Sequence, residues 1–315
     1  MHRLQKLLIT VATLAALFFT SQQVLAQEWY PLRSGILFGI SGIALSAREG
    51  NSLSFLIVHD NKQANRGRLA SITFKDKEQP QYVPLKWPAK TPLPFDLEAI
   101  TAVPGEKDTT LTGSPDKVSV RTEPSFMAST SSGRIYHFRL STFNQDISID
   151  KVFNFPDIPK GSNFEGFSLT KIDDMLLAVW AHRGADEEAA LIYWGQLDLK
   201  TYQISPIGST SFKVPWPLTN VRHISDLKVD PTGVLFISSA KDPGNDGPFE
   251  SAVYVAGVFN GDRNQVTFRQ NSELVPLYRF DEHKIEAIEL VPGQTGGVIF
   301  GTDNENMGSF IYTSW

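Results

Sequence analysis

The chain carries many short apolar-rich runs, separated by turns rich in glycine, proline, asparagine and aspartate. Residues 134–140, for example, largely alternate polar and apolar side chains. A period of two residues is typical of a β-strand with one buried face. Apolar residues at helical spacing are nearly absent. The pattern predicts an all-β protein.

One short pattern occurs five times along the chain. It consists of an apolar residue, then Glu or Ser, then usually Gly or Ala, and then another apolar residue. We call the five copies, residues 39–43, 96–100, 163–167, 223–227 and 284–288, the anchors. Their central residues are Ser41, Glu98, Glu165, Ser225 and Glu286, which are 57, 67, 60 and 61 positions apart. Spacing this regular is a signature of a repeat architecture.

Each anchor is followed by further strand-like runs. The expected strands are 43–47, 53–58, 68–74 and 81–87 in the first repeat, 99–103, 125–128, 134–140 and 147–155 in the second, 176–180, 191–197 and 202–212 in the third, 234–237, 252–259 and 265–269 in the fourth, and 298–300 and 310–313 in the fifth. The last repeat is one strand short, and residues 29–32 are expected to supply it. Four-stranded units repeated around an axis form a β-propeller. We predict five blades, with six as the alternative, in one domain that covers residues 27–315.

The N-terminus has the features of a secretory signal peptide. His2, Arg3 and Lys6 precede an apolar run, and small residues precede a cleavage position after Ala26. We expect residues 1–26 to be removed, although an uncleaved anchor is the alternative reading. The mature chain is then an exported monomer, in the periplasm or outside the cell, with no membrane span.

Composition narrows the function classes. The 315 residues include no cysteine, which excludes disulfides, zinc–thiolate sites and cysteine nucleophiles. The formal charge of −5 and the absence of a basic patch or tail give no case for a nucleic-acid partner.

Polar residues gather at two equivalent positions of the repeat, the anchor starts and the ends of the second strands. Because the second strand runs back antiparallel to the first, both positions are expected at one mouth of the central channel. The anchor set is Asp96, Glu98, Asn163, Glu165, Arg222, His223, Ser225, Asp226, His283, Lys284 and Glu286. The second-strand set is His59, Asp60, Asn61, Ser129, His182, Arg183, Lys241, Asp242, Asp303, Asn304 and Glu305.

The carboxylates of these sets suggest a metal. Glu98, Glu165, Glu286 and Asp303 offer the oxygen ligands that Ca²⁺ prefers. The three glutamates have an equally weighted structural reading, in which they clamp backbone N–H groups at the start of each inner strand. Asp226 breaks the repeat and is a candidate catalytic residue, or else an acid in a surface turn.

Histidines and cations are interleaved with these acids. His223 and His283 are candidates for a general acid or base. His59, His182, Arg183, Lys241 and Lys284 are candidates for binding an anionic substrate. Alternatively, Arg183 and Lys241 only balance Asp186 and Asp242 in solvated loops.

The anchors Asp96-Leu97-Glu98-Ala99-Ile100 and Asn163-Phe164-Glu165-Gly166-Phe167, together with Ile224-Ser225-Asp226-Leu227, resemble those of bacterial phytase-like propellers, often labelled esterase-like. They are also similar to the wider group of strictosidine synthase-like and gluconolactonase-like propellers. These families usually have six blades, whereas the repeat predicts five. The resemblance implies Ca²⁺ in or near the channel and hydrolysis of a phosphate or carboxylic ester.

Three functions follow, in order of preference. The first is a Ca²⁺-dependent hydrolase of a small anionic ester. The second is a non-catalytic propeller that docks an envelope protein or a glycan. The third is a five-bladed glycosidase, which would use carboxyl groups from different blades.

Overall fold

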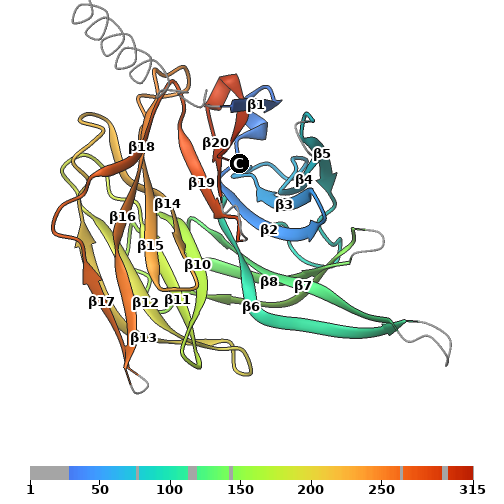
Figure 1. Cartoon of the computed structure of the whole chain (residues 1–315). Coiled ribbons are helices and arrows are strands. Elements are labelled where there is room, and N and C mark those ends of the chain that lie inside the picture. Colours follow the sequence, from blue (N-terminus) through green and yellow to red (C-terminus); the bar gives the residue numbers. More distant parts are fainter. Residues whose placement is uncertain are drawn as a thin grey trace, which may run out of the picture.

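The computed structural model describes residues 28–75, 78–112, 119–141, 145–262, 265–292 and 297–314. These residues form five antiparallel sheets arranged as a ring, so the predicted five-bladed β-propeller is confirmed (Figure 1). The expected signal peptide lies outside the described residues. Within them, no helix is long and apolar enough to cross a membrane.

The first three blades follow the predicted order of four consecutive strands. Blade one contains β2 (Gly42–Glu49), β3 (Ser52–Val58), β4 (Leu69–Lys75) and β5 (Gln81–Leu85). Blade two contains β6 (Leu97–Thr112), β7 (Ser119–Thr130), β8 (Arg134–Leu140) and β9 (Ile147–Asn154). Blade three contains β10 (Phe164–Ile172), β11 (Met175–His182), β12 (Ala190–Asp198) and β13 (Gln203–Phe212).

The last two blades are less regular. Blade four contains β14 (Val221–Val229), β15 (Val234–Lys241), β16 (Glu250–Asp262), β17 (Gln265–Gln270) and β18 (Pro276–Asp281). Blade five contains β19 (Ile285–Leu290), β20 (Val298–Thr302), β21 (Ser309–Thr313) and β1 (Glu28–Arg33). Strand β1 is the outermost strand of that sheet, and it pairs antiparallel with β21 so that Trp29 lies opposite Tyr312. Two 3-10 helices, Ile36–Phe38 and Glu305–Met307, lie in connecting loops.

The first strand of each blade lies at the centre of the ring. Strands β2, β6, β10, β14 and β19 each contact the next in turn, and β19 contacts β2. Four of them begin within an anchor, and β14 begins at Val221, just before its anchor. The five anchors therefore surround one end of the channel.

Two features of the sheets differ from the expected strands. Strand β6 does not end at Pro104-Gly105, because the chain only shifts register between Ala102 and Lys107 and then continues as a long hairpin with β7. Gly105 has a φ of 81°, which lets the strand bend at this point without ending. Strand β18 was not expected; β16 is long enough to pair with β17 along one half and with β18 along the other.

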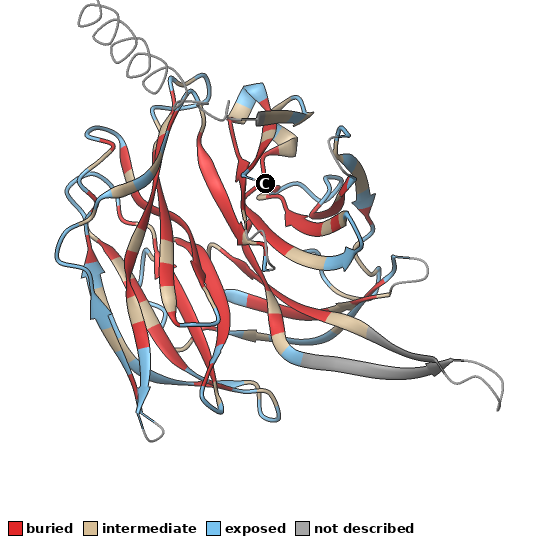
Figure 2. Cartoon of the chain, in the orientation of Figure 1, coloured by how far each residue is buried: buried red, intermediate tan, exposed pale blue. Residues whose placement is uncertain are grey.

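The hydrophobic core consists of five clusters, each between two neighbouring blades. The cluster between blades four and five, for example, packs Phe280 of β18 against Phe300 of β20, with ring centroids 5.4 Å apart. Burial is concentrated in the inner and middle strands, and the outer strands carry most of the exposed positions (Figure 2). Because each blade packs on both neighbours, the anchors are held in a fixed ring.

Candidate active site

A β-bulge at three of the anchors positions a glutamate. In β6, β10 and β19, the pairing with the second strand skips Glu98, Glu165 and Glu286, respectively. A residue skipped at a bulge is released from the ladder, and its side chain is re-aimed. All three glutamates are buried, with exposed fractions of 7%, 2% and 2%. In these three anchors, the bulge therefore places a carboxyl group at the channel mouth.

The small residue after the glutamate has a packing reason, which is clearest at Gly166. A Cβ atom added there would lie 2.7 Å from Cγ of Leu227 and 3.0 Å from its backbone nitrogen. Leu227 belongs to the inner strand of the next blade, so the two strands approach too closely for a side chain at this position.

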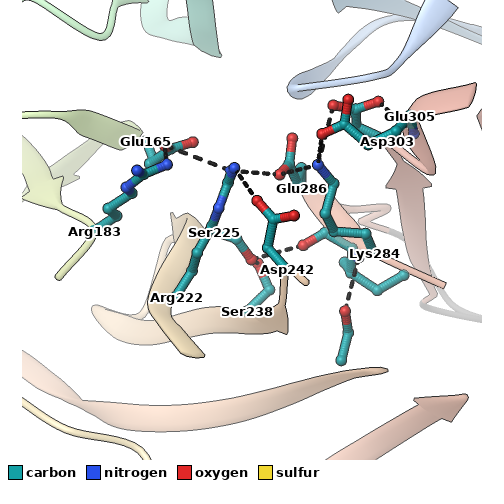
Figure 3. Close-up of polar contacts among 12 residues, drawn as sticks. Glu165, Arg183, Arg222, Ser225, Ser238, Asp242, Lys284, Glu286, Asp303 and Glu305 are labelled. Atoms are coloured by element: carbon teal, nitrogen blue, oxygen red, sulfur yellow. Dashed lines mark hydrogen bonds and ion pairs between the residues drawn. The ribbon is translucent and has the colours of Figure 1, made fainter. Parts of the chain in front are cut away.

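Arg222 joins three carboxylates from three blades (Figure 3). Its Nη1 lies 2.8 Å from Oε1 of Glu286 and 3.7 Å from Oε1 of Glu165. Its Nη2 donates to Asp242, which follows β15 in the same blade as Arg222. Burial alone would lower the pKa of Arg222, but Glu286 and Glu165 outweigh burial and raise it. Arg222 is therefore a permanent cation that fixes Glu165 and Glu286 near one another.

Lys284 is a second buried cation at the mouth, with no exposed surface. Its Nζ lies 3.3 Å from Oε1 of Glu286 and 3.3 Å from Oδ2 of Asp303, and it also pairs with Glu305. Burial would lower the pKa of the amine, but the carboxylates of Glu286 and Asp303 overcome this and raise it. The mouth on the side of blades four and five is therefore a network of paired charges.

The side of blades one and two is different, because carboxyl groups predominate there. Burial raises the pKa of Glu98 well above its ordinary value, and the nearby Glu165 and Asp96 raise it further. Burial, followed by the charges of Asp303 and Asp96, raises the pKa of Asp60 to about 7. The Lys62 amine, 3.0 Å from Oδ1 of Asp96, belongs to a side chain that is 55% exposed. Burial also raises the pKa of Glu286 well above its ordinary value, against the charges of Lys284 and Arg222. Raised carboxyl pKa values thus occur on both sides of the mouth, and the two buried cations Arg222 and Lys284 lie on the side of blades four and five.

The two histidines predicted as acid or base are held by other groups. Nδ1 of His223 accepts the backbone N–H of Val214 at 3.3 Å, and Nε2 donates to the carbonyl of Asp186 at 2.8 Å. Both ring nitrogens are therefore occupied, and burial lowers the pKa of this histidine. The ring of His283 stacks on Trp29 with a centroid distance of 3.7 Å, and burial lowers its pKa to about 4.

The two histidines predicted to bind substrate also contact loop backbone. Nδ1 of His59 lies 2.6 Å from the carbonyl of Gly39, and its Nε2 lies 3.1 Å from the Tyr82 hydroxyl. Nδ1 of His182 accepts the backbone N–H of Asn163 at 2.9 Å. These contacts hold the loops that lead into the anchors, which gives both histidines a structural role; substrate binding by them stays a prediction.

Asp226 lies in the channel wall and is almost fully buried. Its Oδ1 accepts the N–H of Leu227 and its Oδ2 accepts the N–H of Ile288, both at 2.7 Å. Since Ile288 belongs to blade five, Asp226 connects two blades. Burial raises the pKa of Asp226, against the opposing charge of Lys228. These contacts describe a structural clamp, so the alternative of an acid in a surface turn is wrong, whereas the catalytic role of Asp226 stays a prediction.

Two of the predicted anion-binding cations have partners that the sequence did not indicate. Arg183 donates to Oε1 of Glu165 at 3.2 Å and so belongs to the mouth network. Lys241 pairs with Glu250 of the adjacent strand at 2.8 Å. Neither pairs with the aspartate expected to balance it, since Asp242 binds Arg222.

The binding of Ca²⁺ by Glu98, Glu165, Glu286 and Asp303 stays a prediction. No group of three or more histidine, aspartate or glutamate side chains is placed to hold a metal ion within the described ranges. Arg222 and Lys284 occupy the positions between Glu165, Glu286 and Asp303 instead. A cation bound there would have to displace both side chains.

Arg222 and Glu305 received no role from the sequence, although both lie in the polar sets. The available signal was the fourth anchor, which has Ser225 where three other anchors have glutamate. Carboxylates that converge repel one another, so a cation near them is the expected compensation. Arg222, three residues before Ser225, fits that description.

Comparison with known proteins leaves the family open. The chain matches no model of a known protein family. No curated protein is detectably similar to it in sequence. The resemblance to phytase-like propellers therefore stays a prediction, apart from the propeller fold.

Several solved structures are similar in overall fold. The GH43 endo-arabinanase from Bacillus licheniformis has a TM-score of 0.48 and 12% identity, over 89% of this chain and 94% of that one. The Penicillium chrysogenum α-L-arabinanase has a TM-score of 0.44 and 8% identity, over 91% and 96%. A luciferin-regenerating enzyme has a TM-score of 0.40 and 10% identity, over 92% and 96%. Similarity at this level carries no conclusion about activity.

Proposed function

We propose that this protein is a glycoside hydrolase that acts on an uncharged saccharide at the acidic channel mouth. The observation that carries the proposal is the contrast between Glu98 and Glu165, which occupy equivalent bulges on neighbouring blades. Burial raises the pKa of Glu98 well above its ordinary value, whereas Glu165 contacts the guanidinium groups of Arg183 and Arg222. Two carboxyl groups in such different environments suit the two roles, acid and partner, that glycoside hydrolysis requires.

The reaction follows from these two states. Glu98 donates its proton to the glycosidic oxygen as the bond to the anomeric carbon breaks. The carboxylate of Glu165 stabilises the positive charge that develops on the sugar ring. In an inverting course, Glu165 takes a proton from the attacking water; in a retaining course, it bonds to the anomeric carbon, and Glu98 then activates the water. Among the surrounding charges, Glu165 has the largest effect on the pKa of Glu98, which supports their pairing.

Arg222 has a positioning role in this proposal. Oxygens of Glu165 and Glu286 both contact its Nη1, so the guanidinium holds these two carboxyl groups beside each other. Glu286 also contacts Lys284, which holds it in the charged network. Because it contacts both Lys284 and Arg222, we assign Glu286 to the support of the Arg222 guanidinium that contacts Glu165.

The charge balance favours an uncharged substrate. Arg183, Arg222 and Lys284 each contact at least one carboxylate already. On the opposite side of the mouth, Asp60 and Glu98 would repel an anion whenever they ionise. A phosphate or carboxylate would have to compete with the carboxylates that already pair with these cations. The hydroxyl groups of a sugar can form hydrogen bonds with both protonated and ionised carboxyl groups.

An exposed aromatic residue lies beside the acids. Phe95 is 61% exposed and directly precedes Asp96, whose Oδ2 accepts a hydrogen bond from Ser131 at 2.6 Å. A phenyl ring that is fixed at one end and open on its face can pack against the apolar face of a sugar ring. We assign Phe95 to this platform.

The proposal is tested with aryl glycosides and polysaccharides, by following the release of the aryl group or of reducing sugar. Glu98→Gln is expected to lower kcat at least about 100-fold, the usual range for loss of a general acid. The exposed Glu273→Gln is the matched control and should leave the rate unchanged.

The same panel includes phosphomonoesters and aryl esters, with and without Ca²⁺. Cleavage of an ester but no glycoside would overturn the proposal in favour of the ester hydrolase predicted from the sequence. Binding of a glycan without any cleavage would overturn it in favour of a docking propeller.

A further inference from the structure

A cavity of about 490 Å³ lies at the end of the channel opposite the acidic mouth. We call it the distal cavity. Its lining comes from the far ends of all five inner strands and from the turns that follow them. Its volume falls among those of small-molecule sites, which range from about 300 to 1,000 Å³. None of the residues assigned to glycoside hydrolysis lines it.

Most of the lining is apolar. Leu45, Ala102, Leu169, Val229, Leu290 and Val291 contribute aliphatic side chains, together with three prolines. Apolar surface that faces water is unfavourable, and covering it with an apolar ligand lowers the free energy. An exposed apolar lining of this kind is typical of a binding site.

A buried ion pair provides the polar part of the distal cavity. Nζ of Lys228 lies 3.1 Å from Oε2 of Glu289 and 3.4 Å from the carbonyl of Ile43. Glu289 also accepts the N–H of Leu45 at 3.1 Å and that of Leu290 at 2.8 Å. The carboxylate is therefore well satisfied. An ammonium group has three N–H donors, so Lys228 retains one for a further acceptor.

The charges of the side chains that line the distal cavity cancel. Lys171 and Lys228 are matched by Asp230 and Glu289. A charged ligand would bring an unbalanced charge into an apolar space, which is costly. A neutral molecule with one hydrogen-bond acceptor meets the remaining donor without this cost.

We propose that the distal cavity binds a neutral amphiphile, with an alkyl body of about ten carbons and one carbonyl oxygen that accepts a hydrogen bond from Lys228. Ketones, esters and lactones belong to this class. The alkyl body covers the aliphatic lining, and the carbonyl oxygen lies beside the Lys228–Glu289 pair. The site is independent of the proposed hydrolytic activity.

The experiment uses 2-undecanone as the probe and isothermal titration calorimetry on the full protein. We expect a Kd of about 10–100 µM for this ketone and at least tenfold weaker binding of decanoate and of decylamine. Decanoate binding as tightly as the ketone would contradict the neutral class, and no binding of 2-undecanone at millimolar concentration would overturn the proposal.

Two variants locate the site. Ala102→Trp fills the distal cavity and should weaken binding at least tenfold, whereas the exposed Ala89→Trp is its matched control. Lys228→Met/Glu289→Gln removes the donor without leaving an isolated buried charge, and the glutamine retains an acceptor for the N–H of Leu45. This double variant should bind the ketone at least fivefold more weakly. Unchanged affinity in either cavity variant, with its fold intact by circular dichroism, would refute the assignment.

Discussion

The ammonium group of Lys284 lies 3.3 Å from Oδ2 of Asp303, although neither side chain has more than 5% of its surface exposed. Lys284 directly precedes β19, and Asp303 directly follows β20, so the contact joins the two positions of the repeat that meet at the channel mouth. It also shows how the mouth tolerates several buried acids: the cation comes from the same blade as the carboxylates it neutralises.

Lys284→Met should destabilise the protein by about 3–5 kcal/mol at pH 7, because the buried Glu286 and Asp303 and the half-buried Glu305 lose their shared cation. The loss should be smaller at pH 4, where carboxyl groups take up protons. Urea unfolding at the two pH values measures both effects. Lys241→Met is the control, because its single pair with Glu250 is worth at most about 1 kcal/mol. Equal losses in the two variants would refute the central role of Lys284.

Asp60 should make the stability depend on pH. Its pKa is about 7 in the folded protein, against an ordinary value of 3.8. The folded state therefore holds a proton that the unfolded state releases, so stability falls as the pH rises from about 4 to 7. Asp60→Asn removes this contribution and should be more stable than the wild type by about 1–3 kcal/mol at pH 8, relative to their difference below pH 4. Parallel stability curves from pH 4 to 8 would show that Asp60 titrates normally.

The same substitution should alter the pH dependence of the proposed glycoside hydrolysis. Glu98 must be protonated to act as the acid, so kcat/KM should fall as the pH rises through its pKa. The charge of Asp60 raises that pKa, and Asp60→Asn should therefore move the alkaline limb to lower pH, by up to about one pH unit. Asp174→Asn, an exposed substitution in the β10–β11 turn, is the control. An alkaline limb that does not move would separate Asp60 from the catalytic acid.

Gly39→Ala should disturb the mouth from the side of blade one. A Cβ atom at residue 39 would overlap the carboxylate of Asp303, which packs directly against the glycine. We expect a destabilisation of about 1–3 kcal/mol, as for other overpacked sites. Gly67→Ala is the control, since a Cβ atom there meets nothing within 4 Å. Thermal unfolding of both variants measures the difference, and equal melting temperatures would show that Asp303 can move aside.

Most of the fold could be predicted from the sequence because the repeat is explicit. The anchors recur at nearly constant spacing, and each is followed by strands whose period is visible in the residues themselves. The predictions of individual strands were wrong where the same residues are typical of two kinds of structure, or where a strand is not repeated. Pro104-Gly105 reads as a turn, but it lies within a strand that bends at a bulge. Strand β18 has no counterpart in the other blades, so the repeat could not predict it.

The site was less predictable because it depends on where side chains point. Glu98, Glu165 and Glu286 could be found because they stand at one position of the repeat. Arg222, the partner of Glu165 and Glu286, was missed, because the bulges that turn these two side chains toward it cannot be recognised in a single sequence and Ser225 was only an indirect signal. The histidines were assigned to catalysis or binding because their residue type suits both. In the structure, His59 and His223 use their ring nitrogens to hold loops.

The pairing of β1 with β21 sets an order on the folding of the molecule. Blades one to four are each built from one continuous stretch, so they can form as the chain leaves the ribosome. Blade five cannot, because Glu28 must wait for Thr313, almost the whole chain later. Closing so long a loop is slow. Until then, β1 and the open sides of blades one and four are unprotected, and we expect the nascent protein to be most prone to aggregation in that interval.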